Sequence, residues 1–125
     1  MDSRWGTLAA IRHEACGADR VVRCFVERPA GLHAMFERAL AQAPAAELLV
    51  FGPRRWTYAD AATQVQRHAA ALHAAGIVRG DRVALFMGNR PEFVWTLLAL
   101  ARLGAVAVPI GIREQLPGLA TPRRR

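Results

Sequence analysis

The chain has 125 residues, which is enough for one compact domain and too few for a multi-domain protein. Hydrophobic residues make up 53% and charged residues 22%, a balance that excludes a disordered tail and a fibrous repeat. The formal net charge is +7, and every basic residue other than histidine is an arginine, so chemistry that needs a lysine is excluded within the chain.

Residues 1–25 are weakly patterned. We expect a short helix there, followed by an apolar stretch at Val21 and Val22. An acidic residue, Asp2, comes early and only a short apolar run follows, so the segment is not typical of a signal peptide.

The remaining composition favours a reduced, cytoplasmic protein. Cys16 and Cys24 lack the C-x-x-C spacing of a redox or metal motif and do not form a disulfide framework. The most apolar segment, residues 93–110, contains Arg102 and is too short for a membrane span. No membrane-spanning segment is therefore expected.

Two elements are predicted before the centre of the chain. Apolar residues recur at helical spacing over residues 32–43, and Pro44 should end that helix. A short apolar run, a turn at Gly52 and Pro53, and a second extended segment together predict a hairpin over residues 48–57.

A second amphipathic helix follows. Thr57 and Asp60 have the spacing of a capping box, in which the threonine hydroxyl accepts the Asp60 amide hydrogen. Apolar residues then form one stripe, and Gly76 falls where a left-handed residue would end the helix.

The last part of the chain predicts a strand, a helix and a strand. Residues 83–87 and 105–109 are apolar strands, and the helix between them has Asn89 as a candidate N-cap and Glu92 to complete a second capping box. This order is typical of an α/β fold with a parallel βαβ unit. Such strands need a covering layer on both faces, and the remaining residues can cover one side well. The pattern is that of the start of a larger α/β protein.

Few side chains could hold a metal. His33 and Glu37 lie four residues apart on the first predicted helix, but no third ligand is nearby. His68 and His73 point in different directions on the next helix and are interpreted as surface residues. We expect no metal site.

Nucleophiles are equally scarce. Ser3 is the only serine and lies at the end of the chain. His13 and Cys16 share a face of the first expected helix, but no third group orients them. We therefore assign no catalytic residue.

No phosphate-binding loop is recognisable. Gly76 and Gly104 end helices, Gly80 belongs to a turn, and Gly111 stands alone after a strand. Nor do the arginines cluster as on a nucleic-acid-binding face; only residues 123–125 form a run, which we interpret as a solvated tail.

Five segments follow one another along the chain: residues 55–60 (RWTYAD), 69–72 (AAAL), 76–84 (GIVRGDRVA), 88–94 (GNRPEFV) and 100–110 (LARLGAVAVPI). In this order they resemble the class I adenylate-forming (AMP-binding) family, in its acyl-CoA synthetase or carboxylate–CoA ligase branch. The resemblance divides the chain into a poorly patterned segment (1–25), the N-terminal part of an AMP-binding ligase domain (26–120) and an arginine-rich tail (121–125).

The resemblance implies a two-step reaction in the complete enzyme. ATP activates a carboxylic acid as an acyl-adenylate, and a thiol, usually that of coenzyme A, then takes the acyl group. ATP, Mg²⁺ and CoA are thus implied for the full-length family. The family residues that hold them lie downstream of the region present here, so no catalytic, cofactor-binding or metal-binding residue is carried over to this chain.

Members of the family continue past a position like Ala120 with another helix and strand, whereas residues 121–125 end this sequence. Our hypothesis is a truncated or frameshifted acyl-CoA synthetase-like protein, inactive alone. The alternative is a small interaction protein that docks onto the remainder of a split ligase. A third interpretation, an arginine-rich nucleic-acid binder, is disfavoured by the scattered charge.

Overall fold

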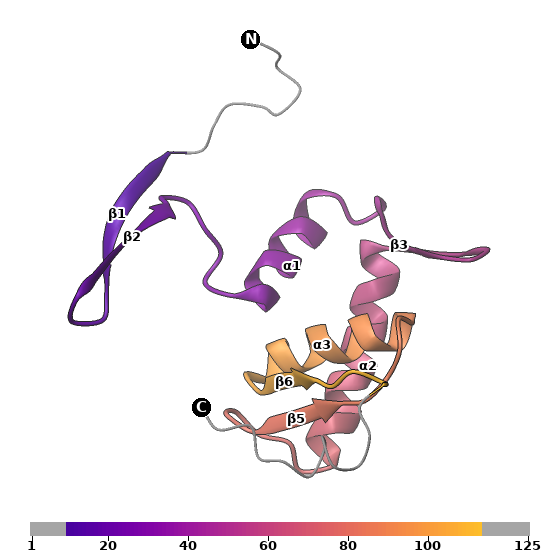
Figure 1. The fold of residues 1–125 in the computed structure, drawn as a ribbon. Coiled ribbons are helices and arrows are strands. Elements are labelled where there is room, and N and C mark those ends of the chain that lie inside the picture. Colours follow the sequence, from indigo (N-terminus) through magenta and orange to yellow (C-terminus); the bar gives the residue numbers. More distant parts are fainter. Residues whose placement is uncertain (1–9, 114–125) are drawn as a thin grey trace. The chain divides into compact units, whose positions relative to one another are not determined.

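The computed structural model describes residues 10–113 and divides the chain into two units, Met1–Ala30 and Gly31–Arg125 (Figure 1). The elements in chain order are β1 (Ile11–Cys16), β2 (Arg20–Phe25), α1 (Leu32–Gln42), β3 (Glu47–Phe51), β4 (Arg54–Thr57), α2 (Tyr58–Ala74), β5 (Arg82–Leu85), α3 (Pro91–Leu103) and β6 (Val106–Pro109).

Over residues 11–25 the first unit forms an antiparallel hairpin, β1–β2, where the sequence analysis expected a helix followed by an apolar stretch. The strands pair from Ile11 opposite Phe25 to Cys16 opposite Arg20. The three-residue connection begins at Gly17, whose φ of +78° is the left-handed conformation that a short hairpin loop needs. The expectation of a helix was wrong because β-branched and aromatic residues in this segment favour strands once such a turn brings them together.

The second unit begins with the predicted helix and hairpin. α1 ends at Gln42, ahead of Pro44, and buries Phe36. The strands β3 and β4 pair antiparallel, with an irregularity in register between Glu47 and Leu49. Both predictions are confirmed.

Helix α2 has the predicted signals at both ends. The Thr57 hydroxyl accepts the Asp60 amide hydrogen at 3.1 Å, and the Asp60 carboxylate accepts the Thr57 amide hydrogen at 2.9 Å. Two hydrogen bonds to the Asp60 carboxylate, from the Thr57 amide and from the Thr57 hydroxyl at 2.7 Å, hold the pKa of Asp60 below its ordinary value. At the other end Gly76 has a φ of +89°, and the Ile77 amide donates to the Leu72 carbonyl at 3.1 Å.

The predicted βαβ unit is present, with β5 and β6 paired in parallel from Arg82 opposite Val106 to Leu85 opposite Pro109. In Figure 1 the two strands lie side by side next to α3, which also packs against α2.

The start of α3 differs from the sequence prediction: its N-cap is Arg90, without a side-chain capping bond, and not Asn89. Pro91 occupies the first helical position and disfavours helical backbone in the residue before it, so Arg90 is extended. Asn89 is then one residue too early to cap, and the capping box with Glu92 does not form. The Glu92 carboxylate instead accepts from Arg90 Nε at 2.8 Å.

The core lies between the helices of the second unit. Its buried members come from α1, α2 and α3: Phe36, Ala61, Val65, Ala69, Trp95, Leu98 and Ala99. Trp95 meets Trp56 of β4 edge-on, with ring centroids 5.8 Å apart. The core is therefore built on one side of the βαβ unit.

The other side of the parallel pair is uncovered within residues 31–113 of the second unit. Side chains alternate along the strands, so Leu85, the last residue of β5, is buried, while Phe86 after it and Val106 and Val108 of β6 are 53%, 48% and 36% exposed. We call these three residues the open face. Within residues 31–113, the strands are thus covered on one side, in agreement with the sequence prediction.

Candidate functional site

The carboxyl ends of β5 and β6 border a cavity of about 390 Å³. The last ladder contact joins the Ile110 amide to the Leu85 carbonyl at 3.0 Å. The cavity lies between the segments that follow, and its lining is Met87, Gly88, Asn89, Phe93, Pro109, Ile110, Gly111, Ile112 and Arg113. We call this space the edge cavity.

The lining of the edge cavity joins apolar walls to two polar groups. Met87, Phe93 and Ile110 supply apolar surface, while Asn89 supplies an amide and Arg113 a guanidinium. Among these lining residues only Arg113 carries a charge.

The neighbouring arginine is already paired. Arg90 contacts Glu92 at 2.8 Å. A backbone hydrogen bond at the helix start, together with the bond from Arg90, holds the pKa of Glu92 below its ordinary value. The charge at the N-terminus of α3 is thus largely balanced, and the positive charge among the lining residues is that of Arg113.

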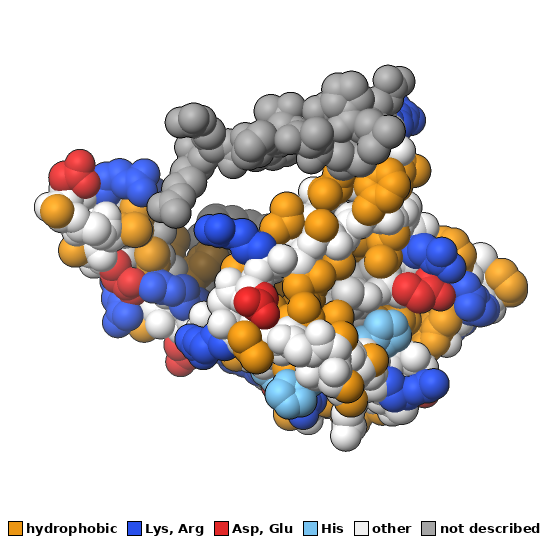
Figure 2. Space-filling view, turned by 90° about the horizontal axis from the view of Figure 1, so that it is seen from below, with side chains coloured by type: hydrophobic (Ala, Val, Ile, Leu, Met, Phe, Trp, Pro, Cys, Tyr) orange, Lys and Arg blue, Asp and Glu red, His pale blue; other side chains and the backbone are white. Residues whose placement is uncertain are grey.

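A second cavity, of about 350 Å³, lies between α1 and α3. Its lining is Leu32, Met35, Phe36, Ala39, Leu48, Tyr58, Val94, Leu97 and Leu98. Apart from the phenol of Tyr58, these side chains offer only apolar contact. Hydrophobic side chains also reach the surface elsewhere, interspersed with arginines (Figure 2).

The residues weighed as metal ligands do not converge. His33 Nε2 lies 3.9 Å from Glu37 Oε1, and His68 Nδ1 contacts the Gln64 carbonyl at 2.8 Å. Over residues 10–113 no three His, Cys, Asp or Glu side chains form a group that could hold a metal ion.

The candidate nucleophile pair is also separated. His13 and Cys16 lie three apart on strand β1, so their side chains point to opposite faces of the hairpin. Their predicted common helical face was wrong because the segment is a strand. Ser3 and the arginines at 123–125 lie outside the described residues.

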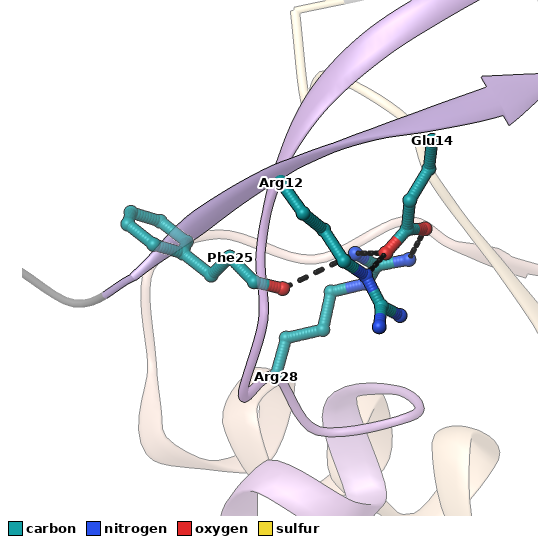
Figure 3. A network of polar contacts seen from close by, with 4 residues as sticks. All are labelled: Arg12, Glu14, Phe25 and Arg28. Carbon is teal, nitrogen blue, oxygen red and sulfur yellow. Dashed lines mark hydrogen bonds and ion pairs between the residues drawn. The ribbon is translucent and has the colours of Figure 1, made fainter.

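An ion-pair network that sequence reasoning missed crosses the first hairpin (Figure 3). Glu14 accepts hydrogen bonds from Arg12 and Arg28, and Arg28 also donates to the Phe25 carbonyl at 3.3 Å. The bonds from Arg28 and then Arg12 lower the pKa of Glu14 to about 2. The alternation of charges along the strand was the available signal, but the pairing becomes visible only once the segment is read as a hairpin.

Within residues 10–113 no helix has both the length and the apolar character needed to cross a membrane.

Comparison with known protein families gives a match within the second unit. The model of the AMP-binding enzyme family matches residues 36–121. Crotonobetaine/carnitine–CoA ligases of Salmonella paratyphi A and Proteus mirabilis are each 43% identical to this chain over 60 residues. That match is 48% of this chain and 12% of each ligase, so the chain corresponds to a small part of these curated relatives.

Solved structures give the same assignment. The Mycobacterium tuberculosis fatty acyl CoA synthetase superposes with a TM-score of 0.68 and 38% identity, over 70% of this chain and 18% of that one. The Klebsiella oxytoca NpsA N-terminal subdomain in complex with anthranilyl-AMSN gives a TM-score of 0.68 and 30% identity, over 70% and 23%. The family match spans more than half of the residues of this chain. The chain therefore belongs to the AMP-binding enzyme family and corresponds to part of the N-terminal region of an acyl-CoA synthetase-like protein.

Proposed function

We propose that this chain supplies the first βαβ unit, with its covering helices, of a carboxylate–CoA ligase. The observation that carries the proposal is the family match over residues 36–121. The matched region includes the open face of the parallel strands β5 and β6. Parallel strands are normally covered on both faces, so this face is suited to a second layer from the rest of such a domain.

The complete ligase would use ATP and Mg²⁺ to convert a carboxylic acid into an acyl-adenylate and then transfer the acyl group to CoA. The residues of this chain do not fit ATP or Mg²⁺. The sequence has no lysine, and within residues 10–113 no three side chains form a group that could hold a metal ion. No step of the reaction is therefore assigned to this chain, and by itself it should be inactive. A fatty or other apolar acid as substrate, and a cytoplasmic location, belong to the same proposal.

A segment exchange tests this function. The 60 matched residues of the Proteus mirabilis ligase would be replaced by those of this chain, and acid-dependent exchange of pyrophosphate into ATP would be measured. We expect the chimera to retain exchange and the 125-residue chain alone to show none. Adenylate formation by the chain alone, or a soluble, folded chimera without exchange, would contradict the proposal.

The second candidate function is docking in trans onto the remainder of a split ligase, and the open face favours it. Co-expression of this chain with a ligase lacking the matched segment should give a complex. Val106→Asp should weaken it at least about tenfold, because a buried unpaired carboxylate is costly. The matched control is Val50→Asp on β3, which is 45% exposed and lies outside the open face. Equal effects of the two substitutions would contradict docking through this face.

A further inference from the structure

The first hairpin, β1–β2, lies outside residues 36–121, the region that the family model matches, so the proposed function leaves it unassigned. We propose that one face of this hairpin binds a partner protein, through a helix that carries an acidic residue between two apolar ones. The inference does not rest on the ligase proposal, because it uses residues 11–25 alone.

The strand register sorts the hairpin side chains into two faces. Directly opposed residues of antiparallel strands point to the same side, and successive residues alternate between the sides. One face therefore holds three cross-strand pairs, which are Ile11 with Phe25, His13 with Arg23, and Ala15 with Val21. We call these six residues the basic–apolar face. The opposite face holds Arg12, Glu14, Cys16, Arg20, Val22 and Cys24.

The opposite face is closed by its own ion pairs. Glu14 is bound there by Arg12 and Arg28, and the Glu14 side chain is 23% exposed. In Figure 3 the Phe25 ring points away from this network. All six residues of the basic–apolar face are exposed, and Val21 and Phe25 are 69% and 54% exposed. Over residues 10–30 the hairpin thus has one closed face and one face open to solvent.

The small size of this sheet gives the open face a reason to be covered. Among the described residues the sheet consists of β1 and β2. Two strands alone are marginally stable in water and gain stability by packing against another element. The pairs Ile11–Phe25 and Ala15–Val21, at the two ends of the face, are the apolar surface that such an element would bury.

The charge in the middle of the face selects the occupant. His13 and Arg23 stand opposite each other between the two apolar pairs, and the six residues include no acid. A second copy of the face would bring like charges together, which is costly in an interface. Elements that bind lipid surfaces keep their basic residues on the polar side and not within the apolar face. A protein surface with one central carboxylate fits, because the carboxylate can pair with Arg23 while its apolar neighbours contact the two ends.

The spacing of the three pairs fits one side of a helix. Pairs two residues apart along a strand are separated by about 6.6–6.8 Å. Residues four apart in a helix are separated by about 6 Å along its axis. A helix lying along the strands would therefore place an apolar, an acidic and an apolar side chain, each four residues after the last, over the three pairs in turn.

A defined peptide tests the interaction with the full 125-residue chain. The probe is an alanine-rich peptide of about 20 residues, long enough to be helical, in which leucine, glutamate and leucine are four residues apart. The control peptide has glutamine in place of the glutamate. With the chain nitrogen-15 labelled, the probe should shift the Nε signal of Arg23 saturably in NMR spectra and leave that of Arg20 unchanged. The control peptide should bind about fivefold more weakly, because it lacks the ion pair.

Two substitutions on β2 remove the same charge from opposite faces of the hairpin. Arg23→Gln should weaken binding of the glutamate peptide about fivefold and change binding of the glutamine peptide by less than about twofold, as a direct contact requires in a double-mutant cycle. Arg20→Gln is the matched control and should change the binding of either peptide by less than about twofold.

Equal effects of the two substitutions, equal effects of Arg23→Gln on the two peptides, or no shift at millimolar peptide would overturn the proposal. Two other occupants are tested in parallel. Binding to vesicles of phosphatidylglycerol and phosphatidylcholine that displaces the peptide would assign the face to a lipid surface. A dimer in sedimentation that Arg23→Gln strengthens would assign it to a second copy, and either result would overturn the proposal. Pyrophosphate exchange by the chimera is measured separately, so failure of this surface and failure of the ligase proposal are distinguishable.

Discussion

The same substitution on the two sides of the βαβ unit should have very different costs. Val65 of α2 is 1% exposed and faces α3, whereas Val106 of β6 is 48% exposed on the open face. Threonine keeps the β-branched shape and has a similar helix propensity, so Val→Thr mainly replaces a methyl group by a hydroxyl.

The magnitude follows from burial. Burying a hydroxyl without a full partner costs about 1–3 kcal/mol, and a helical threonine can recover part of that by bonding to the carbonyl four residues earlier, here that of Ala61. We expect Val65→Thr to lower the free energy of unfolding by about 1.5–2 kcal/mol. Val106→Thr should change it by less than about 0.5 kcal/mol, as at ordinary surface sites.

Urea unfolding followed by circular dichroism at 222 nm measures both values. With a slope of about 1 kcal/mol per molar urea for a small domain, the midpoint should fall by about 1.5–2 M for Val65→Thr and by less than about 0.5 M for Val106→Thr. An equal, large loss for both variants would refute the reasoning, because it would mean that the open face is covered in solution. Two negligible losses would refute the packing of α2 on α3.

Three further outcomes follow from the same structure. Thr57→Ala should lower the free energy of unfolding by about 1 kcal/mol through loss of the capping box, and Thr57→Ser should restore most of it, both measured by urea unfolding. Gly104→Ala should lower the free energy of unfolding by about 1–2 kcal/mol, because Gly104 has a φ of +72° and an added Cβ would lie 3.1 Å from an Arg79 side-chain carbon. Gly88→Ala has neither constraint and should lower it less, again measured by urea unfolding. A larger loss for Gly88→Ala than for Gly104→Ala would contradict this explanation. The pKa of Glu14 is lowered to about 2 from 4.5, so the stability that its ion pairs add to the hairpin is present above pH 4.5 and is lost as the pH falls toward 2. An NMR titration of the Glu14 carboxyl checks this, and a midpoint near 4.5 would contradict the network.

The sequence was sufficient wherever a structural signal is local. Pro44 ends α1, Thr57 and Asp60 cap α2, and Gly76 terminates that helix, because each acts through hydrogen bonds or backbone angles within a few residues. The order of apolar segments similarly predicted the parallel pair and, within residues 31–113, the cover on one of its sides. These local motifs also carried the family resemblance, which the match over residues 36–121 confirms.

Tertiary structure decided what depends on distant partners. Residues 11–25 form a hairpin because Gly17 places two weakly patterned strands opposite each other, which in turn brings Glu14 to Arg28. The edge cavity likewise joins Asn89 to Arg113 only because β5 and β6 end at the same edge. Spacing along a chain cannot reveal such neighbours, since the strand register that sets them is fixed by long-range hydrogen bonds and packing.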